Sequence, residues 1–325
     1  MKLHIKILPS ILLLCFSATA QKQLLVAVQQ RPDSVAIVDL NKHVIIAQLP
    51  TGLMPHELCY DKISKRCFIT NFGVEDYDNR IGTPGNSITI INPFAHKIIE
   101  TIYTRPDSVA NCPHGIKIRP GKARELFVNV EIGDSMIVYD LATLVIKRKF
   151  SVPKGTHNFI FSPAGDRLWL FTGIDGVFEI NPDNGKVIQH KIFSSPIRGL
   201  TFIKDNILAS GKNELFILSK KDLSIVKQIK NLQVGQILYS AVTNDNRYII
   251  APVALDNIVL IIDAINGKIL KRLQTGQTPI NVQVTKNFAY VSHALDDHIT
   301  RIDLHSFKTY NDIKVRGANG IIIIN

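Results

Sequence analysis

One β-rich pattern recurs seven times along the 325 residues of the chain. In each copy, a run of β-branched and apolar residues ends in Asp, Asn or Ser, and a second β-rich run follows after a short turn. The turn anchors stand 38 to 53 residues apart, and they are Asp39, Asn92, Asp140, Asn181, Ser219, Asp263 and Asp303. Such side-chain oxygens can accept a hydrogen bond from the backbone amide two residues on, which stabilises tight turns between strands.

Each copy also contains an inner pair of β-rich runs. In "HNFIFSPAGDRLWLFT", residues 157–172, the segment from Pro163 to Asp166 is a turn between two such runs. Four short strands in a repeat of this length are typical of a β-propeller blade. No amphipathic helical pattern interrupts the series. The sequence therefore predicts an all-β fold, a seven-bladed β-propeller.

The two ends of the repeat region complement each other. The segment "QLLVAV", residues 23–28, corresponds to the second strand of a repeat, and "GANGIIIIN", residues 317–325, corresponds to a first strand. We expect the two segments to pair, because this completes the seventh blade, closes the ring and leaves no open sheet edge in that blade.

The first twenty residues follow a different pattern. Lys2 and Lys6 form a basic segment, residues 7–16 are apolar, and Ala18-Thr19-Ala20 is typical of a cleavage site. This pattern predicts a signal peptide over residues 1–20, cleaved near Ala20–Gln21. We expect residues 21–325 to form one propeller domain without a transmembrane segment, monomeric, and located in the periplasm or secreted.

Basic residues exceed acidic ones, with a formal net charge of +11 that falls to +9 without Lys2 and Lys6. The Lys and Arg residues are scattered between the predicted strands and form no basic stripe with interleaved aromatic residues. This distribution favours a solvated periphery, and nucleic-acid binding through the basic surface is a minor alternative.

Three cysteines remain after cleavage of the signal peptide: Cys59, Cys67 and Cys112. Cys59 and Cys67 flank a predicted hairpin turn, so a cross-strand disulfide between them is one interpretation. The other is that all three are small apolar residues in or near a core. The sequence leaves both open.

The chain resembles the YVTN-repeat β-propellers of the YncE and surface-layer type. The matching motifs are "IVDL", "IIDA" and "RIDL" at strand ends, "TGLMPHEL" and "TGQTPINV" before first strands, and "FSPAGDRLWL" across an inner hairpin. The resemblance extends over residues 21–325 and is weaker in the repeats anchored at Asn181 and Ser219. It implies an exported seven-bladed propeller and no particular activity, because this fold supports many functions.

Polar side chains recur where each predicted first strand begins. His56, His157 and Arg198 each stand 17 residues after a turn anchor, and His114 follows its anchor by 22 because "RPDSVANC" is inserted. In a propeller the first strands line the central channel. The six polar residues expected around one mouth of the channel, with Ile280 in the remaining blade, are His56, His114, His157, Arg198, Tyr239 and Asn319.

A long loop, residues 71–87, is predicted to overhang the same mouth and to contribute Asp76, Asp78 and Arg80 to ligand contacts. These features predict a non-enzymatic module that binds a small molecule, peptide or protein at the mouth. The other interpretation of the histidines is a structural polar lining that hydrogen-bonds water in the channel. His293 lies on another loop of this face, and we expect it to be a solvated loop residue.

Two alternatives use the same face. His56, His114 and His157 could ligate a divalent metal, although equivalent atoms in adjacent blades are expected to be wider apart than the roughly 3–4 Å between two ligands of one ion. We therefore predict no cofactor. A lactonase-like hydrolase would use His56, His114, Arg198 and Asp76, with histidine as general base, although the chain contains no linear catalytic motif.

Overall fold

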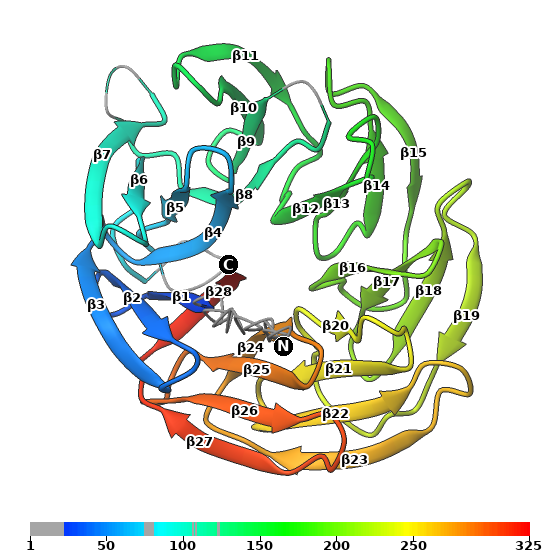
Figure 1. Ribbon diagram of the computed structural model, residues 1–325. Helices are drawn as coiled ribbons and strands as arrows, with labels where there is room; N and C mark the ends of the chain where they lie inside the picture. The colour runs from blue at the N-terminus through cyan, green and yellow to red at the C-terminus, as the bar shows by residue number, and fades with distance from the viewer. Residues whose placement is uncertain (1–22, 75–80, 106, 108, 122–123) are drawn as a thin grey trace, which may run out of the picture.

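The computed structural model describes residues 23–74, 81–105, 107, 109–121 and 124–325. Seven four-stranded antiparallel sheets surround a central channel, so the predicted seven-bladed β-propeller is confirmed (Figure 1). The described residues form no helix, and therefore none that could cross a membrane. The predicted signal peptide, residues 1–20, lies outside the described residues.

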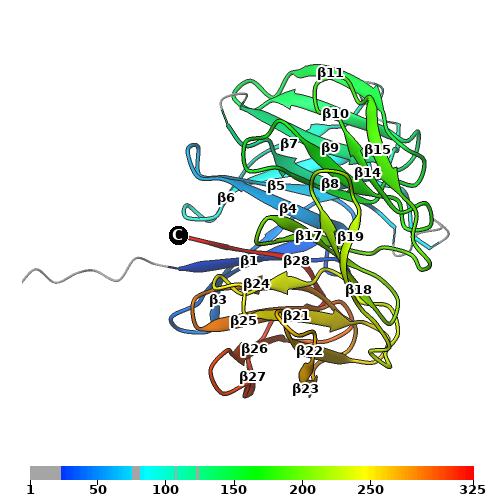
Figure 2. The same ribbon diagram turned by 90° about the vertical axis from the view of Figure 1, so that its right-hand side faces the viewer.

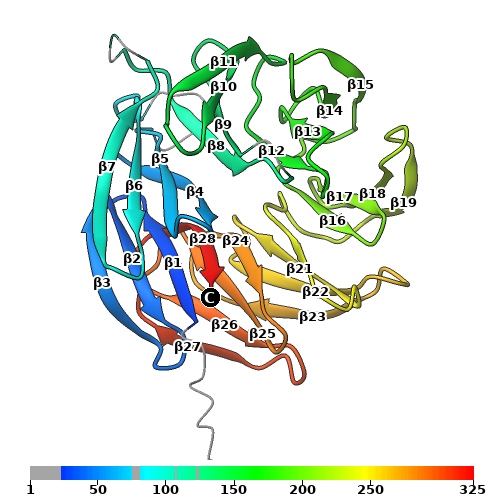
Figure 3. The same cartoon turned by 45° about the horizontal axis from the view of Figure 1, so that its top comes forward.

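Each blade has four strands, counted from the channel outward, with the outermost at the rim (Figures 1 and 3). The innermost strands are β28 (Ala318–Ile324), β4 (Pro55–Asp61), β8 (Pro113–Ile118), β12 (Asn158–Phe161), β16 (Leu200–Ile203), β20 (Ala241–Val242) and β24 (Pro279–Val284). The second strands are β1 (Leu24–Gln29), β5 (Arg66–Asn71), β9 (Glu125–Val130), β13 (Leu168–Phe171), β17 (Asn206–Ser210), β21 (Tyr248–Val253) and β25 (Phe288–His293).

The two outer positions follow the same order around the ring. The third strands are β2 (Ser34–Asp39), β6 (Ser87–Asn92), β10 (Ser135–Asp140), β14 (Val177–Ile180), β18 (Leu215–Ser219), β22 (Ile258–Asp263) and β26 (Ile299–Asp303). The outermost strands are β3 (Val44–Pro50), β7 (Lys97–Tyr103), β11 (Ile146–Ser151), β15 (Val187–Lys191), β19 (Ile225–Ile229), β23 (Ile269–Gln274) and β27 (Thr309–Ile313).

Strands from opposite ends of the chain form the closing blade, as the sequence predicts. Its order is β28-β1-β2-β3, and β28 pairs with β1 in an antiparallel register that places Leu24 opposite Ile324 (Figure 2). Both strands are therefore hydrogen-bonded within a complete four-stranded sheet, and the ring has no gap at this point.

The turn anchors act as the sequence predicts. In all seven, the side-chain oxygen accepts a hydrogen bond from the backbone N–H two residues on. The bonds are Asn41 N–H to Asp39, Phe94 N–H to Asn92, Ala142 N–H to Asp140, Asp183 N–H to Asn181, Lys221 N–H to Ser219, Ile265 N–H to Asp263 and His305 N–H to Asp303. These turns join the third strand of each blade to the outermost one.

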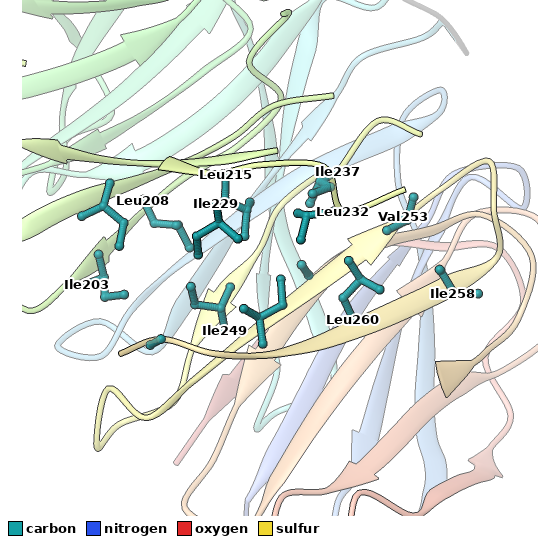
Figure 4. Packing of buried hydrophobic residues seen from close by; sticks show 14 residues of the cluster. Ile203, Leu208, Leu215, Ile229, Leu232, Ile237, Ile249, Val253, Ile258 and Leu260 are labelled. Carbon is teal, nitrogen blue, oxygen red and sulfur yellow. The ribbon is translucent and has the colours of Figure 1, made fainter. Parts of the chain in front are cut away.

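Apolar side chains pack between neighbouring blades. Figure 4 shows one cluster of buried side chains, in which Leu208 and Leu215 of one blade lie beside Ile249 and Leu260 of the next blade. The second and third strands are almost entirely buried, whereas the outermost strands alternate between exposed and half-buried residues. This gradient follows from two-sided packing: the second and third strands of each sheet are covered on both faces by neighbouring blades, so their sequences are continuous apolar runs.

Cys59 and Cys67 are both buried and are not joined in a disulfide. In the β4–β5 pair, Cys59 lies opposite Phe68 and Cys67 lies opposite Tyr60. Since neighbouring residues of a strand point to opposite faces of the sheet, the two thiols face different inter-blade cores. The structure thus favours the interpretation as core residues, and burial raises the pKa of Cys59 to about 12.

Glu125 is a buried carboxylate held by three cations. Arg148 donates two hydrogen bonds to it at 2.6 and 2.9 Å, and Arg119 and Lys147 lie 3.1 and 3.0 Å from its oxygens. The hydrogen bonds from Arg148 lower the pKa of Glu125 to about 2, against the effect of burial.

We expect Glu125→Gln to destabilise the fold at pH 7 by on the order of 3 kcal/mol, because a buried ion pair loses one partner. A carboxylate with a depressed pKa stabilises the fold above its unfolded-state pKa, near 4.5, and loses this contribution as the pH falls toward 2. Urea unfolding at pH 7 and pH 3 should therefore show a smaller difference for the variant than for the parent. Asp183→Asn is the control, because Asp183 contacts Arg119 from an exposed position. An unchanged pH dependence in Glu125→Gln contradicts this account.

Candidate functional site

Five of the six predicted mouth residues line one cavity of about 350 Å³. The cavity lies at the end of the channel where the innermost strands begin, and the five residues are His56, His157, Arg198, Tyr239 and Asn319. His114, the sixth, does not line the cavity, because it is wholly buried behind His56 and His157.

The rest of the cavity lining is mostly apolar. Phe72, Ile81, Leu238, Ile280, Ala294 and Leu295 supply this surface, and Gln30, Arg31 and Thr278 complete the lining. Among the described lining residues there are two arginines and no carboxylate. The cavity therefore combines an apolar wall with a positively charged one.

Tyr239 separates this cavity from the rest of the channel. Its side chain also lines a second cavity of about 340 Å³, which includes Lys117 and Asn158. Asn158 Nδ2 lies 3.5 Å from the Tyr239 hydroxyl oxygen, and Glu57 is buried beside them. Burial raises the pKa of Glu57, and Lys117 opposes this effect.

The three histidine rings lie in a row, tilted to one another, and are called the histidine stack below. The ring centroids of His56 and His114 are 4.2 Å apart, those of His114 and His157 are 3.8 Å apart, and those of His56 and His157 are 6.4 Å apart. The three rings are thus close together, but the group of potential ligand atoms that includes His114 and His157 does not include His56. The innermost strands converge on the channel axis, so inward side chains from adjacent blades meet.

Gly320, which follows Asn319 in β28, shows how close this convergence is. A Cβ atom on Gly320 would lie 2.6 Å from the backbone oxygen of His56, so a side chain here would force the two innermost strands apart. Glycine at this position permits the close approach of β28 and β4.

The histidines differ in their hydrogen bonds. His157 Nδ1 lies 2.8 Å from Glu131 Oε1, and His56 Nε2 lies 3.4 Å from Asn319 Nδ2. Neither ring nitrogen of His114 makes a hydrogen bond of ordinary geometry within the described part of the chain, and the same holds for His56 Nδ1. Phe72 packs edge-on against both His56 and His114, at centroid distances of 5.3 and 4.7 Å.

Burial lowers the pKa of all three imidazoles. It lowers that of His56 to about 4, and it holds those of His114 and His157 well below their ordinary value, with the neighbouring rings adding to the effect. All three rings are therefore neutral at pH 7.

Glu131 is the site residue that the sequence analysis missed. It follows β9 in a loop between a second and a third strand, so it does not belong to the series of residues before first strands. Burial raises its pKa to about 8, with Arg198 opposing and Asp134 adding to the shift. A survey of the first residue after each second strand would have singled it out, because these loops face the mouth.

The loop over residues 71–87 is closed at its base. Val74 pairs with Gly82 in an isolated bridge, and Gln30 Nε2 donates a hydrogen bond to the Val74 oxygen at 3.1 Å. Gly73 has a positive φ of 84°, and a Cβ there would lie 2.1 Å from the Thr83 oxygen, so only glycine fits. The predicted contacts Asp76, Asp78 and Arg80 lie outside the described residues.

His293 is not a solvated loop residue, so that expectation is wrong. It is the last residue of β25 and is wholly buried. Its Nε2 accepts a hydrogen bond from Gly276 N–H at 3.1 Å, and its Nδ1 lies 3.0 Å from the His298 oxygen. Burial lowers its pKa to about 4, so the ring fixes the loop before β24 as a neutral group.

No family model matches the chain, and no curated protein matches it. The resemblance to the YVTN-repeat propellers therefore stays a prediction. Solved structures do match. The chain is similar to a protein from Bacteroides uniformis named as a candidate 6-phosphogluconolactonase, with 13% identity and a TM-score of 0.69 over 94% of this chain and 100% of that one.

Two further similar structures are enzymes by their names. Hydrazine synthase of Kuenenia stuttgartiensis matches with 15% identity and a TM-score of 0.68, over 86% of this chain and 91% of that one. A dihydro-heme d1 dehydrogenase matches with 14% identity and a TM-score of 0.64, over 92% of this chain and 74% of that one. At such identities the shared feature is the fold.

Proposed function

We propose that this protein binds a small organic anion with an apolar body in the cavity at the channel mouth. The lining of that cavity carries the proposal: Arg31 and Arg198 lie among apolar side chains, with no carboxylate among the described lining residues. Arg198 is half-buried and Arg31 is exposed, and arginine is well suited to carboxylate recognition because its guanidinium donates several hydrogen bonds in a fixed plane.

The size and polarity of the cavity support a small ligand. Cavities that bind small molecules typically enclose about 300–1,000 Å³, so 350 Å³ accommodates one compact molecule. The apolar wall from Phe72, Ile81 and Leu295 would cover the hydrocarbon part. Asn319, Gln30 and Tyr239 offer neutral hydrogen-bonding groups around it.

A matched pair of ligands tests this proposal. We expect 3-phenylpropionate to bind more tightly than 3-phenylpropionamide by roughly 10- to 100-fold, since a hydrogen bond to a charged group contributes about 1.5–3 kcal/mol. Isothermal titration calorimetry measures both affinities. The Arg198→Gln variant should reduce the preference for the carboxylate to within a few-fold, while Arg247→Gln, which lines a different cavity, should preserve it.

Equal affinity for the amide and the carboxylate in the parent protein contradicts an anion site. The proposal is also contradicted if the Arg198→Gln variant retains the preference for the carboxylate and the Arg247→Gln variant loses it. Circular dichroism of each variant establishes that the fold is retained before the affinities are compared.

A second candidate function rests on the Glu131–His157 pair. A buried carboxyl group with a raised pKa, 2.8 Å from an imidazole that lines a cavity, is suited to general acid–base catalysis. A lactonase-like hydrolase is therefore the alternative, and the name of the Bacteroides uniformis protein agrees with it. Hydrolysis of 6-phosphogluconolactone, followed by base consumption against the spontaneous rate, tests it. A rate equal to the spontaneous one removes it.

We also propose that the protein is exported as a YVTN-type propeller and acts as a monomer in the periplasm or outside the cell. The basic and apolar segments of residues 1–20 support export. The intact mass of the protein from its natural host is the test: a chain that still begins at Met1 contradicts cleavage near Ala20–Gln21.

A further inference from the structure

We propose that His114, His157 and Glu131 form a binding site for one Zn²⁺ ion beside the mouth cavity. The site shares His157 with the lining of the mouth cavity, and the proposal does not rest on an organic ligand being bound. Its three side chains come from two adjacent blades: His114 from β8, Glu131 from the loop after β9, and His157 from the residue before β12.

The spacing of the three side chains suits one ion. One candidate ligand atom from each lies within 4.8 Å of the other two, and His157 Nδ1 and Glu131 Oε1 are already 2.8 Å apart. Ligand atoms around tetrahedral zinc are roughly 3.3 Å apart when the bonds are about 2.0–2.1 Å. Binding therefore needs these separations to shorten by at most about 1.5 Å, which is within the reach of side-chain rotation.

The ring nitrogens of His114 are available as metal ligands. The residue is wholly buried, and neither of its ring nitrogens makes a hydrogen bond of ordinary geometry with the described residues, although the ring has a weaker polar contact with the His157 backbone. Buried polar groups are almost always paired, because an unpaired one loses its hydration without compensation. A metal ion is a partner that a buried imidazole can take, and the ring contacts to His56, His157 and Phe72 hold His114 in place.

The set of donors selects the class of metal. Two imidazole nitrogens and one carboxylate oxygen suit zinc and similar transition metals, whereas calcium and magnesium prefer all-oxygen sites. His157 belongs to both the triad and the cavity lining, so a bound ion would lie next to the cavity. Two-histidine, one-carboxylate sets of this kind leave a coordination position for water or a ligand.

One other group of potential ligands requires a control. Asp296, Asp297 and His298 also bring three ligand atoms together, but this group is partly exposed and Lys314 lies 3.7 Å from Asp297. His298→Ala removes it as a source of zinc binding. All titrations should therefore use untagged protein that carries His298→Ala. The protein with this substitution alone is the reference, and every further variant is made in it.

Calorimetric titration with Zn²⁺ alone tests the site. We expect one equivalent to bind, and we expect His114→Leu and Glu131→Gln each to weaken binding by more than the roughly 10- to 100-fold that loss of an outer-shell partner costs. His56→Leu is the matched control, because the His56 ring belongs to the histidine stack but not to the triad. The Zn²⁺ affinity of this variant should stay within a few-fold of that of the reference protein.

Thermal unfolding separates a metal ligand from a structural histidine. Without metal, His114→Leu should raise the melting temperature by about 2–4 °C, because an unpaired buried ring is replaced by an apolar side chain. In the reference protein, excess Zn²⁺ should raise the melting temperature, and His114→Leu should abolish this increase. A structural role for His114 predicts the opposite sign in the first measurement.

Three results would overturn the proposal. The first is no stoichiometric Zn²⁺ binding by the reference protein. The second is binding that His114→Leu and Glu131→Gln leave unchanged, which indicates adventitious surface sites. The third is loss of binding in His56→Leu with retention in Glu131→Gln, which assigns the ion to other ligands. Binding of 3-phenylpropionate is measured separately, in the absence of metal, so failure of either proposal is recognised independently.

Discussion

Deletion of residues 318–325 is expected to abolish the closed propeller. This segment comprises Asn325 and strand β28, the innermost strand of the closing blade, which pairs with β1. Ala318, Ile321 and Ile324 are buried in it. Each large apolar side chain removed from a core costs about 2–5 kcal/mol, so the whole strand contributes an amount comparable to the total stability of a domain, about 5–15 kcal/mol.

The deletion also exposes the long apolar edge of β1, which favours association between chains. We expect the truncated chain to be aggregated or largely unfolded by size-exclusion chromatography and circular dichroism. Removal of Asn325 alone is the control, because this exposed residue follows the strand and contributes only a side-chain contact with Gln23. A truncated chain that unfolds cooperatively near the parent melting temperature would show that β28 is dispensable.

Trp169→Ala should lower the free energy of unfolding by about 3–5 kcal/mol, the range for an aromatic residue removed from a core. Trp169 is wholly buried in β13, where it packs against Phe202 of the next blade at a centroid distance of 6.0 Å. The Arg167 guanidinium carbon lies over its ring, 4.8 Å from the centroid. Alanine would leave a cavity between two blades that their rigid sheets cannot collapse to fill.

Urea unfolding followed by circular dichroism measures this effect, because Trp169 is the only tryptophan and its fluorescence disappears in the variant. Trp169→Phe should recover part of the loss. Ile188→Ala, in the exposed outermost strand of the same blade, should change the stability by less than about 0.5 kcal/mol. A loss below about 1 kcal/mol in Trp169→Ala would show that the blade interface repacks around the missing ring.

The architecture could be predicted because each blade repeats its own local chemistry. Asp39 and its six counterparts mark the turn after every third strand, and their side-chain hydrogen bonds depend only on residues two positions away. Sequence spacing also placed His56 and His157 at equivalent positions of their blades. Interactions between residues that are close in the sequence can be predicted from a single sequence.

The site depends on contacts between blades, and spacing does not encode those. The direction in which His114 points, and the 3.8 Å separation of its ring from that of His157, follow from the convergence of innermost strands around the axis. Glu131 reaches the same cluster from a different kind of loop, so no periodic pattern includes it. The buried state of His293 likewise results from packing against the loop before β24.

The pairing of β28 with β1 also determines how this molecule can be attached to something else. Leu24 and Ile324 lie opposite each other, and Ile324 is at the end of β28 far from Asn319, which lines the mouth cavity. Gln23 Nε2 is 3.1 Å from Asn325 Oδ1, and Figure 2 shows the start of β1 and the end of β28 on the same side of the ring. The ends of the described chain thus form a single attachment point. A linker, surface or fusion partner joined at either end would leave the cavity facing outward and accessible to ligands.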